Sequence, residues 1–164
     1  MTSEIVQHIL ETPIGTIQLL AQFEKLISVS LPGENGELTD NKDFQIVTRD
    51  HSVFKEIVDY IDRYFSGEHV SWEGKYIPDG SDFFRRAWQE AVKIPFGETI
   101  SYGELARRSG SPRAARAAGS AMARNHLPIL IPCHRVIAGD GGIGGFGNSP
   151  GVKRELLRHE GVDI

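Results

Sequence analysis

A single cysteine, Cys133, lies within residues 128–137 and is followed directly by His134. A lone thiol cannot form an internal disulfide, and it cannot supply the cysteine cluster of a structural zinc site. Cys133 is therefore either a buried filler, as free cysteines often are, or a reactive group. Pro132 suits the start of a helical turn, whose unpaired N–H groups favour a thiolate, and His134 is a possible proton acceptor. We interpret Cys133 as a reactive thiol.

The glycine-rich loop that follows has the spacing of a nucleotide-binding motif. Gly142, Gly144 and Gly147 match the pattern G-x-G-x-x-G. A dinucleotide site needs that loop inside a βαβ unit, and only 17 residues follow Gly147 here. We therefore expect no nucleotide cofactor. The loop is either a lid over Cys133 or a plain surface loop, and Phe146 within it either stacks on a planar ligand or fills the local core.

Residues 113–124, RAARAAGSAMAR, form an unusual helix whose apolar content is almost wholly alanine. Arg113, Arg116, Ser120 and Arg124 recur near one face at helical spacing. Small side chains let a helix approach another surface closely, and arginines beside them can contact phosphates or enter a duplex. The alternative is an alanine-rich helix packed in the interior, with its arginines in solvent.

The elements around this helix predict a helix-turn-helix. Ser101 and Glu104 have the capping-box pattern, which opens a helix over residues 102–108, and Gly110 ends it. Ser111 and Pro112 are typical of the N-cap and first position of the next helix. Apolar periodicity predicts two flanking helices, over residues 83–94 and 152–159.

The N-terminal part predicts a small α+β unit. Residues 6–10, 16–22 and 26–31 are β-prone and separated by turn residues, which is typical of an antiparallel meander, with residues 44–48 as an edge strand. Apolar residues at helical spacing predict a helix over residues 53–65, and residues 70–80 form a connector with strand character. We place the N-terminal domain and connector at residues 1–79 and a mostly helical domain at residues 80–164.

Composition narrows the class of protein. Of 164 residues, 24% are charged and 40% hydrophobic, as in soluble globular proteins. We expect no membrane span and no signal peptide, and a free thiol fits the cytoplasm. Residues 1–79 hold 6 Lys and Arg against 14 Asp and Glu, whereas residues 80–164 hold 12 against 8. The basic half could meet phosphates, although this asymmetry alone does not decide it.

The C-terminal motifs together resemble the O6-alkylguanine-DNA alkyltransferases, which repair DNA. The similarity runs from about residue 83 to residue 161 and rests on residues 94–97, 101–102, 114–117, 125, 128–135 and 159–161. It implies a ribonuclease-H-like N-terminal domain and a winged-helix-like C-terminal domain. It also implies a monomer that acts on double-stranded DNA containing alkylated guanine, with alkylated thymine as a second candidate substrate. No cofactor is implied.

The resemblance assigns a role to each residue near the thiol. Cys133 would accept the alkyl group, His134 would be its base through a water, and Glu160 would orient His134. Asn125 would be a hinge between the recognition helix and the active-site turn, and could also be a helix C-cap. Tyr102 would donate a proton or hydrogen bond to the leaving base and help rotate the phosphate.

A DNA surface and a base pocket follow from the same resemblance. Arg116 would replace the extruded base in the stack, with Arg113 and Arg124 beside it. The surface packed in the minor groove would consist of small residues: Ala114, Ala115, Ala117 and Gly119. The base would be enclosed by Met122, Pro128, Phe146, the carbonyls of Cys133 and Val136, and the N–H of Gly147.

Two departures from the family pattern affect these expectations. Some relatives have a tyrosine where Phe146 stands and a serine where Gly147 stands, so those side-chain hydrogen bonds are lost while the backbone N–H remains. Some relatives also bind a structural zinc through N-terminal cysteines. The N-terminal part of this chain has none, so we expect no metal.

The chemistry predicts a single turnover. An alkyl group on the guanine oxygen is inaccessible inside a duplex, so the base must be flipped out. A thiolate attacks that carbon and gives a thioether, which water cannot hydrolyse.

One alternative is a thiol hydrolase, although such sites usually bring Cys and His together from distant positions. The other is a protein that binds alkylated bases without repairing them, in which the nucleophile is replaced, commonly by tryptophan.

Overall fold

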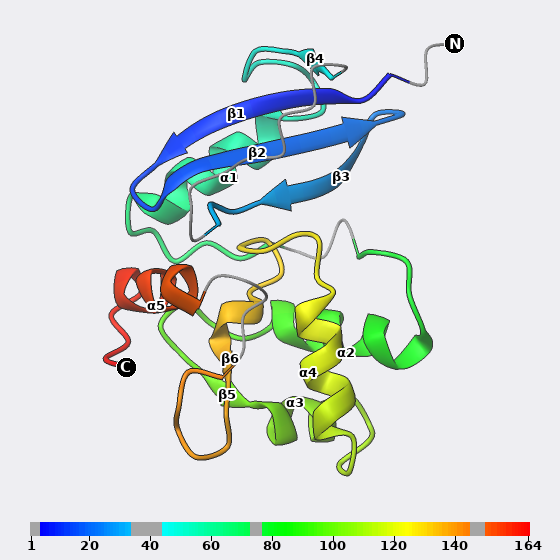
Figure 1. The fold of residues 1–164 in the computed structure, drawn as a ribbon, viewed down its shortest axis with the longest axis vertical. Helices are drawn as coiled ribbons and strands as arrows, with labels where there is room; N and C mark the ends of the chain where they lie inside the picture. Colours follow the sequence, from blue (N-terminus) through cyan, green and yellow to red (C-terminus); the bar gives the residue numbers. More distant parts are fainter. Residues whose placement is uncertain (1–3, 34–43, 73–76, 145–149) are drawn as a thin grey trace.

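The computed structural model describes residues 4–33, 44–72, 77–144 and 150–164. A four-stranded sheet forms the N-terminal part, in the order β3-β2-β1-β4 (Figure 1). Its strands are β1 (Val6–Thr12), β2 (Gly15–Gln22), β3 (Lys25–Ser30) and β4 (Gln45–Ile46). The first three are antiparallel, which confirms the predicted meander, whereas β4 is a two-residue strand that runs parallel to β1.

One face of β2 is apolar, while Gln18 on the other face is also buried and its Nε2 donates to Gln7 Oε1 at 2.9 Å. Ile17, Leu19 and Ala21 are fully buried, and they point to the face that helix α1 (Lys55–Phe65) covers, behind the sheet in Figure 1. The helix buries Ile57 and Ile61 in return. It begins two residues later than the periodicity predicted.

Short elements surround the cysteine in the C-terminal part. Three helices, α2 (Asp82–Val92), α3 (Tyr102–Arg108) and α4 (Ala115–Ala123), pack together, and Trp88 Nε1 donates to the carbonyl of Ala121 at 2.8 Å. The 3-10 turn η1 (Cys133–Arg135) follows, and then comes α5 (Pro150–His159). Two very short strands, β5 (Ile100–Ser101) and β6 (Val136–Ile137), pair in parallel and join the start of α3 to the cysteine turn.

The start of the second helix of the predicted helix-turn-helix was wrong. Helix α4 begins at Ala115, because residues 111–114 close a turn in which Ala114 N donates to Ser111 O at 2.9 Å. Arg113 therefore precedes the helix. The capping box at α3 is half formed: Ser101 Oγ accepts from Glu104 N at 3.0 Å, while the Glu104 carboxylate contacts two arginines.

The two halves meet at the level of the cysteine turn. Val29 N, on the edge strand β3, donates to His126 O at 2.8 Å, just after α4. The last turn of α1 lies next to α5, since His159 Nε2 is 2.8 Å from the carbonyl oxygen of Tyr64 (Figure 1). The described parts of the connector, residues 70–72 and 77–80, contain no strand. None of the described helices has the length and apolar character needed to cross a membrane.

Candidate active site around Cys133

The thiol of Cys133 lies at the start of η1, at the end of a buried loop. Cys133 is 4% exposed, and Pro132 is the N-cap of the turn. Asn125 holds the loop at both ends: its Nδ2 donates to Ile131 O at 2.9 Å, and its Oδ1 accepts from Leu127 N at 2.9 Å. The C-cap of α4 is Arg124, so Asn125 is the residue that links the helix to the cysteine loop.

The same loop contains a strained residue. Ile129 has φ +73° and is fully buried. The left-handed region is unusual for a β-branched residue and costs about 1–3 kcal/mol. The Asn125 hydrogen bonds and the burial of the loop hold Ile129 in place, so the position of Cys133 is set by a loop that costs energy to maintain.

The electrostatic environment of the thiol has opposing parts. Burial raises the pKa of Cys133 above its ordinary value, and this outweighs the effects that lower it. Those are the Asn125 side chain, the charge of Lys153 and the backbone N–H groups of Cys133 and His134. The N–H groups predicted for this turn are present and lower the pKa of Cys133. Burial has the larger effect, so the net shift of the pKa is upward and favours the protonated thiol. Formation of the thiolate therefore needs a base.

The buried carboxylate of Glu160 accepts hydrogen bonds from four donors. Oε1 accepts from Arg135 Nε and from Gly97 N, both at 2.8 Å. Oε2 accepts from Tyr64 OH at 2.7 Å and contacts His134 Nε2. Burial would raise the pKa of Glu160, but His134 and Arg135 lower it to about 2. This carboxylate is therefore ionised at neutral pH.

This ionised carboxylate fixes the tautomer of His134. An ionised carboxylate only accepts hydrogen bonds, so Nε2 of His134 carries the hydrogen and Nδ1 has the lone pair. Nδ1 is buried, and no residue that the structure describes donates to it. Burial lowers the pKa of His134, with Glu160 opposing and Arg135 and Lys153 adding to the decrease. His134 is thus a neutral imidazole with an unused acceptor.

Lys153 is a site residue that the sequence interpretation missed. It is fully buried on α5, and its Nζ donates to Val136 O at 2.7 Å and to Tyr102 OH at 3.4 Å. Burial lowers its pKa to about 8, with Cys133 opposing. A signal existed, because Lys153 shares a helical face with Leu156, Leu157 and Glu160.

Tyr102 lies at the first position of α3, beside the thiol. Burial raises its pKa, and Cys133 adds to the increase. A Cβ at Gly144, which has φ +73°, would lie 3.0 Å from the Tyr102 ring and hydroxyl, so the glycine loop passes against Tyr102. Of the predicted pocket residues, Phe146 and Gly147 lie outside the described residues, while Met122, Pro128 and Val136 are buried. The Val136 and Cys133 carbonyls each already accept one hydrogen bond.

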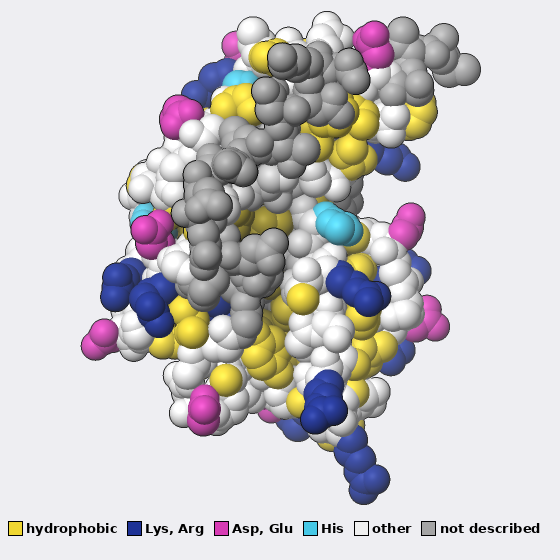
Figure 2. All heavy atoms as spheres, in the orientation of Figure 1, with side chains coloured by type: hydrophobic (Ala, Val, Ile, Leu, Met, Phe, Trp, Pro, Cys, Tyr) yellow, Lys and Arg dark blue, Asp and Glu magenta, His cyan; other side chains and the backbone are white. Residues whose placement is uncertain are grey.

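Helix α4 presents the predicted DNA surface to solvent. Arg113, Arg116 and Arg124 are exposed, and the guanidinium of Arg124 lies 5.7 Å above the Phe84 ring. The predicted small residues between them are partly buried: Ala114, Ala115, Ala117 and Gly119. Ala118, Ala121 and Met122 pack into the core. Figure 2 shows basic side chains separated by hydrophobic and uncharged ones over this part of the molecule.

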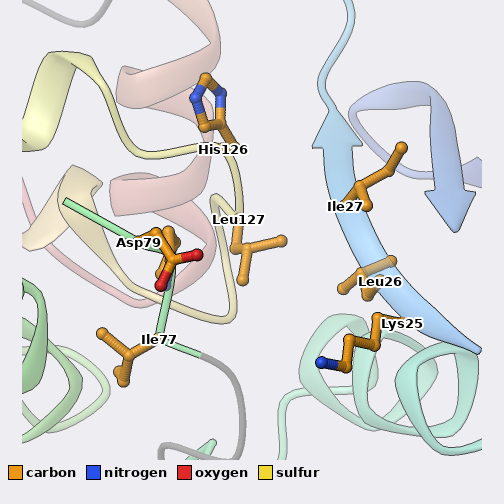
Figure 3. A pocket seen from close by; sticks show the side chains of 8 residues that line it. Lys25, Leu26, Ile27, Ile77, Asp79, His126 and Leu127 are labelled. Atoms are coloured by element: carbon orange, nitrogen blue, oxygen red, sulfur yellow. The ribbon is translucent and has the colours of Figure 1, made fainter. Parts of the chain in front are cut away.

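A separate hollow lies between β3 and the loop after α4 (Figure 3). Lys25, Leu26 and Ile27 line the β3 side of the hollow, and Asp79, His126 and Leu127 lie on the opposite side. Cys133 does not line this hollow, so it forms no part of the site. Within the described ranges, no three His, Cys, Asp or Glu side chains gather in a way that could hold a metal ion.

Comparisons with known proteins cover both halves of the chain. Residues 82–162 match the family model for the DNA-binding domain of 6-O-methylguanine DNA methyltransferase. Residues 5–73 match the model for the ribonuclease-like domain of the same proteins.

Relatives and solved structures agree with these matches. The methylated-DNA–protein-cysteine methyltransferase of Methanosarcina barkeri is 38% identical over 93% of this chain and 94% of its own, and that of Mycobacterium tuberculosis is 36% identical over 92% and 89%. The crystal structure of the M. tuberculosis O6-methylguanine methyltransferase has a TM-score of 0.80 at 33% identity, covering 95% of this chain and 92% of that one. A structure of the M. tuberculosis protein in complex with DNA gives 0.79 at 34%, covering 94% and 91%.

Proposed function

This chain belongs to the 6-O-methylguanine DNA methyltransferase family, and we propose that Cys133 is the residue to which it transfers the alkyl group. The protein repairs DNA by direct alkyl transfer to its own cysteine. The observation that carries the assignment is a single buried thiol next to a neutral imidazole whose tautomer is fixed by an ionised carboxylate. His134 is then the base. Because Glu160 accepts from Nε2 of His134, the lone pair of His134 lies on Nδ1, away from the carboxylate.

The transfer is a displacement at carbon. The thiol proton passes through a water to His134 Nδ1, the Cys133 sulfur attacks the alkyl carbon, and an S–C bond forms as the bond from that carbon to the guanine oxygen breaks. The leaving guanine carries the electron pair and takes up a proton. Tyr102 donates a hydrogen bond or proton to it, and Lys153 next to that hydroxyl favours the donation. The thioether has no carbonyl for water to attack, so each chain reacts once.

The substrate is double-stranded DNA that contains O6-alkylguanine, and O4-alkylthymine is a second candidate. The exposed arginines on and before α4 support this proposal, because they lie beside small residues that permit close approach to a groove. Arg116 occupies the gap left by the flipped base, and Arg113 and Arg124 contact phosphates. Asn125 links this helix to the cysteine loop. Phe146 and Gly147 complete the base pocket with Met122, Pro128 and Val136.

Three further proposals concern organisation and context. The protein acts as a monomer, since the thiol, base and carboxylate all come from one chain. It works in a reducing compartment such as the cytoplasm, where Cys133 stays a free thiol. The division between an N-terminal domain of residues 1–79 and a C-terminal domain of residues 80–164 places the whole proposed DNA surface in the second.

Intact mass tests the acceptor and the stoichiometry. After exposure to a duplex with one O6-methylguanine, the chain should carry one methyl group in place of the thiol hydrogen, a net gain of CH2, and peptide mapping should place it on Cys133. Cys133→Ala should gain none while binding the same duplex. Repair of many lesions by one chain would contradict the single-turnover mechanism, and a methyl group on another residue would contradict Cys133.

A further inference from the structure

Tyr64, on the N-terminal helix α1, reaches into the site. Its side chain is fully buried, and its hydroxyl donates to Glu160 Oε2 at 2.7 Å and lies 3.5 Å from His134 Nε2. Tyr64 is 70 residues before His134 and 96 before Glu160. The N-terminal half, for which the sequence indicated little chemistry, therefore supplies one of the four donors to the carboxylate.

Several contacts hold Tyr64 in this position. Its carbonyl oxygen lies 2.8 Å from Nε2 of His159, and His159 is the residue before Glu160. Its ring packs edge-on against Phe96, with centroids 5.7 Å apart, and Phe96 precedes Gly97, which donates to Glu160 Oε1. Both the backbone and the side chain of Tyr64 are thus attached to the residues that surround the carboxylate.

The hydroxyl shares its acceptor atom with the proposed base. Oε2 of Glu160 interacts with both Tyr64 OH and His134 Nε2, while Oε1 is occupied by Arg135 and Gly97. Burial and the neighbouring carboxylate raise the pKa of Tyr64, so the hydroxyl stays protonated and remains a donor. A donor on Oε2 withdraws negative charge from it, which weakens the attraction of that oxygen for the His134 proton.

We propose that Tyr64 is a positioning residue for the alkyl transfer, through which the N-terminal half holds Glu160 and tunes the proton affinity of His134. The proposal rests on the assignment of His134 as the base. The titratable and charged groups that surround the pair are Arg135 on η1, Lys153 and His159 on α5, Tyr60 on α1, and Cys133 itself.

Tyr64→Phe tests the proposal because it removes only the hydroxyl. Without that donor, Oε2 attracts a proton on His134 more strongly, so His134 should become protonated at a higher pH. An upward shift of about half a pH unit makes single-turnover methyl transfer about threefold slower on the acid side of the pH profile. The rates of variant and wild type should converge at alkaline pH, where His134 is neutral in both. NMR of ¹³C-histidine-labelled protein should show the same shift directly.

Two further variants separate positioning from folding. Tyr60→Phe removes the hydroxyl of a buried tyrosine one turn earlier on the same helix, whose ring packs edge-on against Trp72 at 5.3 Å, and should leave the pH profile unchanged. In a Glu160→Gln background, Tyr64→Phe should cause no further shift, since its effect passes through the carboxylate.

The outcomes are distinct. A rate that falls by the same factor at every pH, with an unchanged His134 titration, would make Tyr64 a packing residue and overturn the proposal, and so would no change at all. If the wild type takes up no methyl group on Cys133, the proposed function fails instead. The His134 titration in the absence of DNA would still decide whether Tyr64 acts on His134 through Glu160.

Discussion

Two charged regions of this protein differ in their burial. Glu160, His134, Arg135 and Tyr64 are between 0% and 6% exposed, and the carboxylate has four donors. On and before α4, Arg113, Arg116 and Arg124 lie in solvent. The buried network sets protonation states, whereas the exposed arginines supply a positive surface.

The difference teaches where single changes matter. Removing one partner of a buried charge leaves the other without compensation, which typically costs about 3–5 kcal/mol. An exposed charge is screened by water and salt, so its loss costs about 1 kcal/mol or less. We therefore expect substitutions in the buried network around Glu160 to have large and specific effects, and substitutions of the arginines on and before α4 to have small, nearly additive ones.

The largest effect is expected for Glu160→Gln. The change removes the charge that compensates Arg135 and stabilises a protonated His134, so transfer should slow about 100-fold, within the range for acid–base groups. The free energy of unfolding should fall by about 3 kcal/mol. Single-turnover kinetics and urea unfolding measure the two effects, and the Kd for DNA should stay nearly constant.

Glu104→Gln is the matched control. Contacts with Arg107 and Arg108 lower the pKa of Glu104 to about 2, as for Glu160, but Glu104 lies on the surface of α3. It should transfer methyl at the wild-type rate. Equal losses in the two variants would show that ion pairing, and not burial, determines the effect.

Acid unfolding should show the buried carboxylate next. The pKa of Glu160 is about 2 in the folded protein and about 4.3 in an unfolded chain. A lowered pKa stabilises the fold above the unfolded value, and this stability is lost as pH falls from about 4.3 toward 2, by about 2–3 kcal/mol. Urea unfolding at pH 5 and pH 3 should show the loss in wild type and a smaller loss in Glu160→Gln. If the free energy of unfolding falls by the same amount between pH 5 and pH 3 in both proteins, Glu160 is not the cause of the loss.

A tenfold slower transfer is expected for Lys153→Met, because the positive charge beside Cys133 lowers the pKa of the thiol. The reaction of Cys133 with a small alkylating reagent should require a higher pH in the variant. The pKa of Lys153 is about 8 in the folded protein and about 10.4 in an unfolded chain. The free energy of unfolding of the wild type should therefore rise, relative to that of Lys153→Met, as the pH increases from about 8 to 10.4. An unchanged thiol titration would place Lys153 in a packing role.

Local patterns predicted the elements that local interactions build. The bounds of α3 were predicted correctly from the Ser101 cap and Gly110 because the helix ends where those residues act. Ser111 and Pro112 were misread, since the same residue types also favour the turn that they form here.

Contacts between distant segments were not predictable. Strands β5 and β6 have two residues each, too few for a period to be visible. The helical periodicity places Tyr64 and Lys153 on the buried faces of α1 and α5, but nothing local indicates which groups their hydroxyl and ammonium groups meet. Their neighbours come from other elements, so their roles appear only once those elements pack together.

The smallest effects are expected on α4, where two arginines distinguish two roles. Arg113→Ala should remove one phosphate contact, which weakens binding of any duplex a few-fold and lowers the salt dependence of log K by about 1. Arg116→Ala should do more, because in the proposed function its side chain fills the gap left by the flipped base, and flipping costs a few kcal/mol. Repair of O6-methylguanine in a duplex should fall about threefold to tenfold, while transfer from the free alkylated base, which needs no flipping, should be unchanged. If duplex and free base lose the same factor, Arg116 supports the fold or the thiol. If Arg116→Ala only weakens binding, as Arg113→Ala does, α4 is a uniform basic surface.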